Sequence, residues 1–235
     1  MESLPSRNWL LDALPTEERE AIFRVSNYRE LRPGDTLYEP NTRITEVFFP
    51  INCVLSNVLV MFNGALVEVG STGWEGVTPI QTSLGAEHVP WEIICQIRGT
   101  VCTMPLESFT TRLREDGEFW ERVRAYGVAT FNVMAQSVAC NRLHSIAQRC
   151  ARWLLTTSDR ARSDDFALTH EFLAVMLGVH RPAVTTAALA LQDAGCIKYR
   201  HGRISITDRE ALEASSCECY RLASDYINRL TATRA

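Results

Sequence analysis

Apolar and polar positions follow two different patterns along the chain and divide it into a strand-rich part and a helical part. Between residues 31 and 106, short runs rich in β-branched and aromatic residues are separated by turn residues such as Pro33-Gly34-Asp35 and Asn63-Gly64. Asn-Gly between two apolar runs is the strongest short-range signal for a β-hairpin. The spacing predicts a small antiparallel, jelly-roll-like β-roll, preceded by short helices over residues 7–30.

A long helical segment follows, from about Gly117 to Ser158, and it carries more than one apolar stripe. One stripe consists of Trp120, Val123, Gly127, Phe131, Met134 and Val138, and a second consists of Phe119, Tyr126, Val133 and Cys140. Two stripes mean that the helix is covered on more than one side, and one side can pack on the roll. The first stripe is the predicted dimerisation surface, because a second copy of the same helix is the simplest remaining partner. Burial of the helix within one chain is the alternative.

The stretch between Thr169 and Gly195 fits two helices joined by a tight turn. Thr169 can cap the first helix, Gly178 can adopt the left-handed conformation of the turn, and Pro182 suits the first turn of the second helix. This is helix-turn-helix spacing, in which the N-terminal residues of the second helix reach base edges in the major groove. An ordinary helical hairpin with a polar edge is the alternative.

A basic hairpin is predicted directly after these helices. In the stretch IKYRHGRISI, residues 197–206, two short apolar strands flank the turn Arg200-His201-Gly202-Arg203. The chain carries a net charge of −4, so contact with nucleic acid requires a local basic patch. Helices and hairpin together predict a winged DNA-binding module. Its candidate DNA contacts are Thr169, His180, Arg181, Thr185, Thr186, Lys198, Arg200, His201 and Arg203.

The polar stretch ARSDDFA, residues 161–167, is a candidate boundary before this module. The predicted organisation is an α+β chain in three parts: N-terminal helices and β-roll over residues 1–116, a long dimerisation helix and hinge over residues 117–160, and a winged helix-turn-helix domain with a C-terminal helix over residues 161–235. A single final helix is expected from about residue 208, with Cys217 and Cys219 on different sides of it.

Several classes of protein are excluded by the remaining residues. The chain has no signal-peptide pattern at its N-terminus and no apolar run near the ~20 residues that span a bilayer, which predicts a cytoplasmic protein without a membrane partner. Only His88 among the five histidines lies in the roll, too few for a metal-dependent cupin enzyme. Because G-x-S-x-G, P-loop and Rossmann fingerprints are also lacking, we expect no enzymatic activity.

The eight cysteines are spread along the chain without a CxxC pair. They are Cys53, Cys95, Cys102, Cys140, Cys150, Cys196, Cys217 and Cys219. In a reducing cytoplasm such residues are mostly small buried hydrophobic side chains. We therefore expect neither a zinc site nor an iron–sulfur cluster from their spacing.

In its order of roll, long helix and winged helix-turn-helix, the chain resembles the Crp/Fnr family of bacterial transcription regulators. The most specific part is LTHEFLAVMLGVHRPAVTTAALALQDAGCIKYRHGRISI, residues 168–206, and LRPGDTLYEP, residues 31–40, is a looser match. The resemblance implies a homodimer that reads a pseudo-palindromic operator in double-stranded DNA, and contact with RNA polymerase if the protein is an activator. Arg181 resembles the family's most persistent contact with base or phosphate. Pro182 stands where the family often has glutamate, which implies a different operator.

The roll contains a weak candidate for an effector site. Family members that bind cyclic nucleotides use a Gly-Glu pair for the ribose and a nearby Arg-Ser or Arg-Thr for the phosphate. Trp74, Glu75 and Gly76 are similar to the first element. The segment over residues 81–92 has no arginine and adds two glutamates, which argues against a cyclic nucleotide.

The absence of cysteines before Cys53 argues against the N-terminal iron–sulfur site of some family members. The sequence thus predicts a homodimeric DNA-binding regulator without a cofactor, modulated by another effector in the roll or by none. The alternative is a roll that binds a ligand or protein partner beside a degenerate DNA-binding domain.

Overall fold

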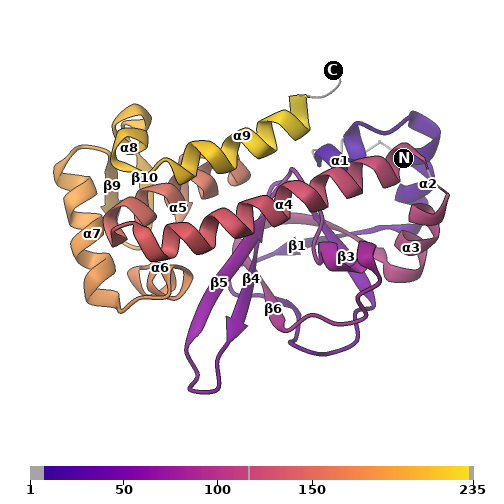
Figure 1. Cartoon of the computed structure of the whole chain (residues 1–235), viewed down its shortest axis with the longest axis horizontal. Helices are drawn as coiled ribbons and strands as arrows, with labels where there is room; N and C mark the ends of the chain where they lie inside the picture. The colour runs from indigo at the N-terminus through magenta and orange to yellow at the C-terminus, as the bar shows by residue number, and fades with distance from the viewer. Residues whose placement is uncertain (1–7, 116, 233–235) are drawn as a thin grey trace.

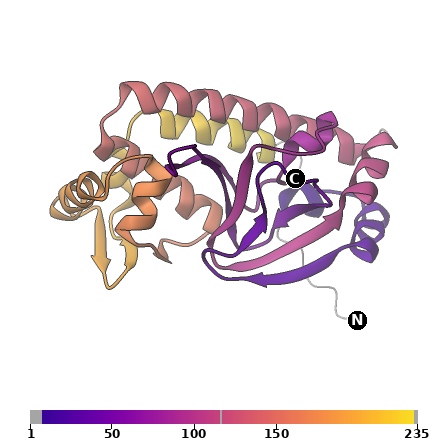
Figure 2. The ribbon, with the colours of Figure 1, turned by 90° about the horizontal axis from the view of Figure 1, so that it is seen from below.

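The computed structural model describes residues 8–115 and 117–232 of the chain. A β-roll occupies one end of the molecule and a small helical module with a β-hairpin occupies the other (Figure 1). One long helix, α4 (Glu118–Leu143), spans both (Figure 2). This is the α+β arrangement that the pattern of apolar positions predicts.

The roll is built from seven strands in two antiparallel sheets. One sheet has the order β1-β7-β3 and the other the order β2-β6-β4-β5. Two short helices precede them, α1 (Trp9–Asp12) and α2 (Thr16–Val25). The strands are β1 (Asn27–Leu31), β2 (Thr36–Tyr38), β3 (Glu46–Pro50), β4 (Val54–Val60), β5 (Leu66–Thr72), β6 (Trp91–Ile97) and β7 (Gly99–Pro105). A 3-10 helix, η1 (Ile80–Leu84), lies between β5 and β6.

The predicted hairpin at Asn63-Gly64 is present between β4 and β5. Leu59 pairs with Val67 and Val60 with Leu66, and the Asn63 side chain accepts a hydrogen bond from the Ala65 backbone N–H at 3.0 Å.

Aromatic side chains of the roll pack against those of the helices that follow it. Phe109 of α3 (Leu106–Arg114) contacts Phe49 of β3 edge-on at a centroid distance of 6.2 Å. Phe109 also contacts Phe119 of α4 at 5.8 Å. All three rings are almost completely buried, so the beginning of α4 is part of the core of the roll.

The predicted long segment is two helices. The α4 helix ends at Leu143, and α5 (Ile146–Ala161) begins after Ser145. Ser145 and Gln148 form a capping box, in which each side chain satisfies a backbone N–H of the new helix. Because α5 packs on α7 (Arg181–Asp193) and α8 (Arg209–Ser215), it belongs to the helical module at the other end of the molecule from the roll.

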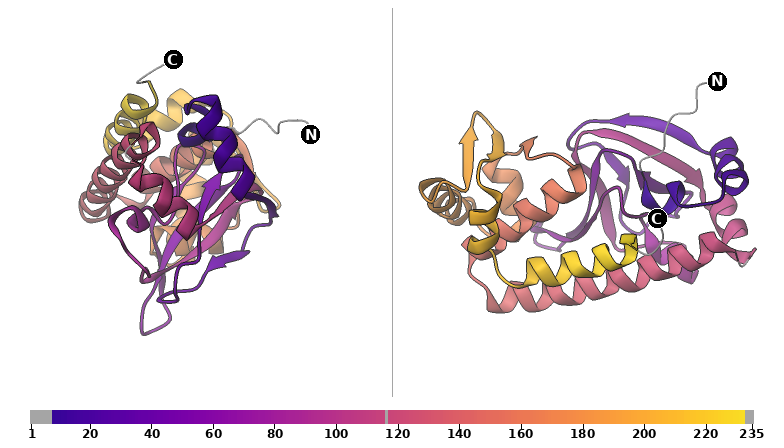
Figure 3. Two further views of the ribbon diagram at one scale, coloured as in Figure 1. Left: turned by 90° about the vertical axis from the view of Figure 1, so that its right-hand side faces the viewer. Right: turned by 90° about the horizontal axis from the view of Figure 1, so that it is seen from above.

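The C-terminal segment also differs from the single helix that was expected. It forms α8 and α9 (Cys219–Ala232), with Cys217 in the break between them. In Figure 3, α9 runs back along α4 beside the roll. One side of α4 is therefore covered by the same chain, as the alternative interpretation of its two stripes allowed.

No single helix within residues 8–115 and 117–232 has the length and apolarity needed to cross a membrane. The pair α6 (His170–Leu177) and α7 passes that test only when the two are taken together, across a bend of 106°.

Candidate nucleic-acid interface and the neighbouring cavity

The α6 and α7 helices form the predicted helix-turn-helix. The Thr169 hydroxyl accepts a hydrogen bond from the Phe172 N–H at 3.1 Å and caps α6. Gly178 ends α6 with φ of 61°, the left-handed conformation that glycine adopts without strain. The helices pack through small and branched side chains that are nearly inaccessible: Leu173, Ala174, Val184, Ala187, Ala188 and Leu191.

The first turn of α7 presents Arg181 to solvent. Arg181 is the first residue of the helix, His180 is its N-cap, and the Arg181 side chain is 67% exposed. Its Nε lies 3.8 Å from Glu171 Oε2, whose side chain is also exposed. An exposed pair at this distance contributes little free energy, so Arg181 can exchange it for a nucleic-acid partner.

The two threonines of α7 differ in how accessible they are to a nucleic acid. Thr186 is exposed and its hydroxyl donates to the Pro182 carbonyl at 3.1 Å. Thr185 is half-buried, donates to the Arg181 carbonyl at 3.2 Å and lies 3.1 Å from His170 Nδ1. Thr185 is therefore already engaged within the protein.

His170 links the wing to the helices, a role that the sequence did not indicate. Its ring stacks on Tyr199 at a centroid distance of 4.2 Å and an interplanar angle of 21°. Burial, and then the positive charge of Arg181, lower the pKa of His170 below its ordinary value of 6.5. The stacked ring is therefore neutral at physiological pH.

The wing consists of β9 (Ile197–Arg200) and β10 (Arg203–Ile206), and a third strand extends its sheet. The β8 strand (Asp165–Ala167) pairs with β10, although the sequence indicated only a polar break there. Arg203 donates from Nε to Asp165 Oδ1 at 3.1 Å, so its charge is partly offset. The other predicted wing contacts, Lys198, Arg200 and His201, are exposed.

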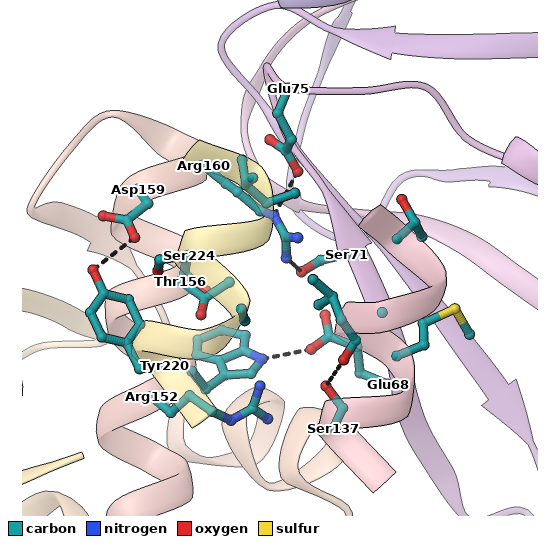
Figure 4. A pocket seen from close by; sticks show the side chains of 18 of the residues that line it. Glu68, Ser71, Glu75, Ser137, Arg152, Thr156, Asp159, Arg160, Tyr220 and Ser224 are labelled. Atoms are coloured by element: carbon teal, nitrogen blue, oxygen red, sulfur yellow. Dashed lines mark hydrogen bonds and ion pairs between the residues drawn. The ribbon is translucent and has the colours of Figure 1, made fainter. Parts of the chain in front are cut away.

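The candidate effector residues connect the roll to the helix α5. Arg160 of α5 donates from Nε to Glu75 Oε1 at 2.8 Å (Figure 4). The Trp74 indole N–H donates to the Asp159 carbonyl at 3.0 Å. Gly76 lies against the Tyr126 ring, so closely that a Cβ there would be 1.9 Å from a ring carbon. Glu75 is 1% exposed and thus serves an internal ion pair in this structure.

A cavity of about 280 Å³ lies between β5, α4, α5 and α9, and Trp74 and Glu75 line it. Its wall carries a second carboxylate, Glu68, which accepts hydrogen bonds from Trp153 Nε1 and Ser56 Oγ at 2.7 Å each. Burial raises the pKa of Glu68. Arg152 also lines the cavity, and its buried Nε has no hydrogen-bond partner within the described part of the chain.

The predicted dimerisation stripe only partly faces outward. Phe131 and Val138 are 71% and 73% exposed. Val123, however, is buried in the core of the roll, and Gly127 faces Ile80. Trp120 and Met134 are half-buried. The exposed large apolar side chains of α4 are Val128, Phe131, Val138 and Leu143, of which Phe131 and Val138 belong to the predicted stripe.

Comparison with known proteins agrees with this geometry. Residues 148–215 match the Crp-like helix-turn-helix domain. No curated protein sequence matches the chain.

Solved structures match the fold over most of the chain. FixK2 from Bradyrhizobium japonicum has a TM-score of 0.69 and 15% identity, over 82% of this chain and 98% of that one. A CRP-family transcriptional regulator from Thermus thermophilus has a TM-score of 0.68 and 16% identity, over 80% and 96%. The c-di-GMP responsive regulator CLP from Xanthomonas campestris has a TM-score of 0.65 and 12% identity, over 83% and 100%. The chain thus carries a Crp-like helix-turn-helix domain within the fold of the Crp/Fnr transcriptional regulators.

Proposed function

We propose that this protein is a sequence-specific DNA-binding transcription regulator, which acts as a homodimer on a pseudo-palindromic operator. The observation that carries the proposal is the position of Arg181, exposed in the first turn of the second helix of a helix-turn-helix. Side chains at that position reach base edges when the helix enters the major groove. An arginine there can bond bidentately to guanine or grip a phosphate.

The wing supplies the sequence-independent part of the binding free energy. Lys198 and Arg200 are exposed on β9, in a chain whose net charge is negative. A local basic hairpin beside the recognition helix fits one phosphate backbone next to the major groove. A roll with a degenerate DNA-binding domain, the alternative function, would have no need for these exposed cations.

The homodimer is proposed from the exposed stripe of α4. Val128, Phe131, Ala135 and Val138 follow the three- and four-residue spacing of a coiled-coil seam, and all four are exposed. Two copies of α4 packed along this seam would present two recognition helices, related by two-fold symmetry, to one face of DNA.

Modulation by a small molecule is proposed for the cavity between α4, α5 and β5. A ligand there would contact the roll and the helix α5 of the DNA-binding end at once. The segment over residues 81–92 offers no arginine for a cyclic phosphate, which supports an effector other than a cyclic nucleotide, although Arg152 and Arg160 lie beside Glu68 and Glu75 in the cavity wall. A regulator of this kind works where bacterial DNA is, in the cytoplasm, and as an activator it would also contact RNA polymerase.

The proposal is tested by selecting binding sites from a random duplex pool with the full-length protein near physiological salt. We expect enrichment of a two-fold symmetric motif whose half-sites lie about 10 base pairs apart. Arg181→Ala is the matched variant and should enrich a motif with lower information at one position per half-site. Wild-type protein that enriches no motif, both alone and with cell extract added as a source of effector, would contradict the proposal.

A further inference from the structure

Three cysteines and one histidine from distant parts of the chain meet where α4 ends and α9 begins. Cys140 and His144 are four residues apart at the end of α4, and Cys217 and Cys219 flank the start of α9. One ligand atom from each, three Sγ atoms and a ring nitrogen, lie within 4.8 Å of one another. The right-hand view of Figure 3 shows the beginning of α9 beside this end of α4.

The surroundings of these thiols differ from those of the other cysteines. Cys53, Cys95, Cys102, Cys150 and Cys196 each belong to a larger apolar cluster. The buried cluster of Cys140, Cys217 and Cys219 contains no other hydrophobic side chain within the described residues. A thiol that serves as a small hydrophobic group packs among apolar neighbours. These three face one another and a histidine instead.

Two of the distances between ligand atoms fit opposite edges of one tetrahedron, and the other pairs lie within 4.8 Å. Cys140 Sγ lies 3.5 Å from Cys217 Sγ, and Cys219 Sγ lies 3.6 Å from His144 Nδ1. Zinc bonds of about 2.3 Å to sulfur and about 2.0 Å to nitrogen give tetrahedral edges of roughly 3.5 to 3.8 Å. The four side chains therefore need only small movements to enclose an ion.

Neighbouring polar groups orient the ligands in the way that metal sites require. His144 turns Nδ1 toward Cys219, and its Nε2 lies 3.2 Å from Glu218 Oε2. A carboxylate on the far nitrogen fixes the tautomer and raises the basicity of the ligating one. The Gln136 side-chain amide donates to Cys219 Sγ at 3.0 Å, which stabilises negative charge on that sulfur.

We propose that Cys140, His144, Cys217 and Cys219 bind one zinc ion in a closed, structural site. Three thiolates and an imidazole are a donor set that zinc prefers, and four protein ligands leave no position for substrate. The absence of a CxxC pair concealed the site, because one half is a Cys-x-x-x-His pair on a helix and the other is a Cys-x-Cys turn. The ion ties α9 to the end of α4, next to Ser145 where α5 begins.

The first test measures metal in full-length protein purified without chelator from cells grown with zinc. We expect about one zinc per chain by mass spectrometry of the metal content. Cys140→Ser, His144→Ala and Cys219→Ser should each lose most of it. Cys196→Ala, which removes a buried cysteine outside the cluster, is the matched control and should retain zinc. Far-ultraviolet circular dichroism establishes that each variant is folded.

The second test does not depend on variants. Zinc is removed from the wild-type protein under reducing conditions and Co²⁺ is added as the probe. We expect the intense visible bands of tetrahedral thiolate coordination, with up to three protons released per ion. Zinc should also raise the midpoint of thermal unfolding and protect the three thiols from alkylation. Folded, reduced wild-type protein that binds neither ion would overturn the proposal, and so would a Cys140–Cys217 disulfide in protein purified from the reducing cytoplasm.

Discussion

Arg160 Nε lies 2.8 Å from Glu75 Oε1, and this ion pair joins α5 of the DNA-binding end to the loop after β5 of the roll. Both side chains are largely shielded from water, with Arg160 12% and Glu75 1% exposed. Arg160 also donates to Ser71 Oγ at 2.6 Å. The position of the roll relative to the DNA-binding end thus depends in part on a charged contact, which lies beside the cavity proposed for an effector.

Glu75→Gln should lower the free energy of unfolding by about 3–5 kcal/mol, because it leaves the buried Arg160 charge without its counter-ion. Urea denaturation measures the change. The double variant Glu75→Leu with Arg160→Met removes both charges and should cost less than the single variant. A double variant that is less stable than Glu75→Gln would contradict this account.

Sequence patterns predicted most of the fold because they record local preferences and burial. The Asn63-Gly64 hairpin, the left-handed turn at Gly178 and the wing strands depend on residues that lie close together in the chain. The break at Ser145 was missed, although the capping box Ser145–Gln148 was a signal for it.

Contacts between residues far apart in the chain could not be predicted from the sequence, because they depend on how separate elements pack. Arg160 approaches Glu75 only once α5 lies against the roll, and α9 covers α4 only because the chain breaks near Cys217. The partly offset charge of Arg203 likewise requires β8, whose three residues are too few to show a period of their own.

Arg181→Ala should weaken binding to a selected operator by about 1–3 kcal/mol per half-site contact and relax specificity at one base pair. Fluorescence anisotropy with the selected site and with single-base variants measures both effects. Glu171→Gln is the matched control, since it removes only the exposed partner of Arg181 and should leave the base preference unchanged. Equal discrimination by Arg181→Ala and wild type would refute the assignment of the recognition helix.

The two wing arginines should differ in their effect on binding. Arg200→Ala should weaken binding to all sequences and reduce the slope of log K against log salt by about 1, as expected for one lost phosphate contact. Arg203→Ala should cause a smaller loss of affinity and a smaller change in the slope, because Asp165 already offsets the charge of Arg203. Asp165→Asn frees Arg203 and should strengthen binding. Titrations with DNA at several salt concentrations measure the affinity of each variant. A larger loss of affinity for Arg203→Ala than for Arg200→Ala would contradict the prediction.

Stability should fall as the pH is lowered through the range in which His170 titrates. Burial lowers its pKa in the folded state below the ordinary 6.5, so the unfolded state binds the proton first on acidification. The free energy contributed by the neutral ring is therefore complete above about pH 6.5 and is lost as the pH falls toward the folded-state pKa. Urea unfolding at pH 7.5 and 5.5 should show a smaller difference for His170→Phe, which keeps an aromatic ring against Tyr199, than for wild type. An identical difference in both proteins would exclude His170 as the source.

Phe131→Glu should convert the proposed homodimer to a monomer without unfolding the chain. Phe131 and Val138 are 71% and 73% exposed and lie seven residues apart on α4, so their apolar surface is available to a second copy and contributes little within one chain. Two glutamates facing each other across a two-fold axis would add like-charge repulsion at that seam. Phe62→Glu, which changes an even more exposed aromatic side chain at the hairpin tip between β4 and β5, is the control and should remain dimeric. Sedimentation equilibrium distinguishes the two states, and a dimer in Phe131→Glu as stable as that of wild type would move the interface away from α4.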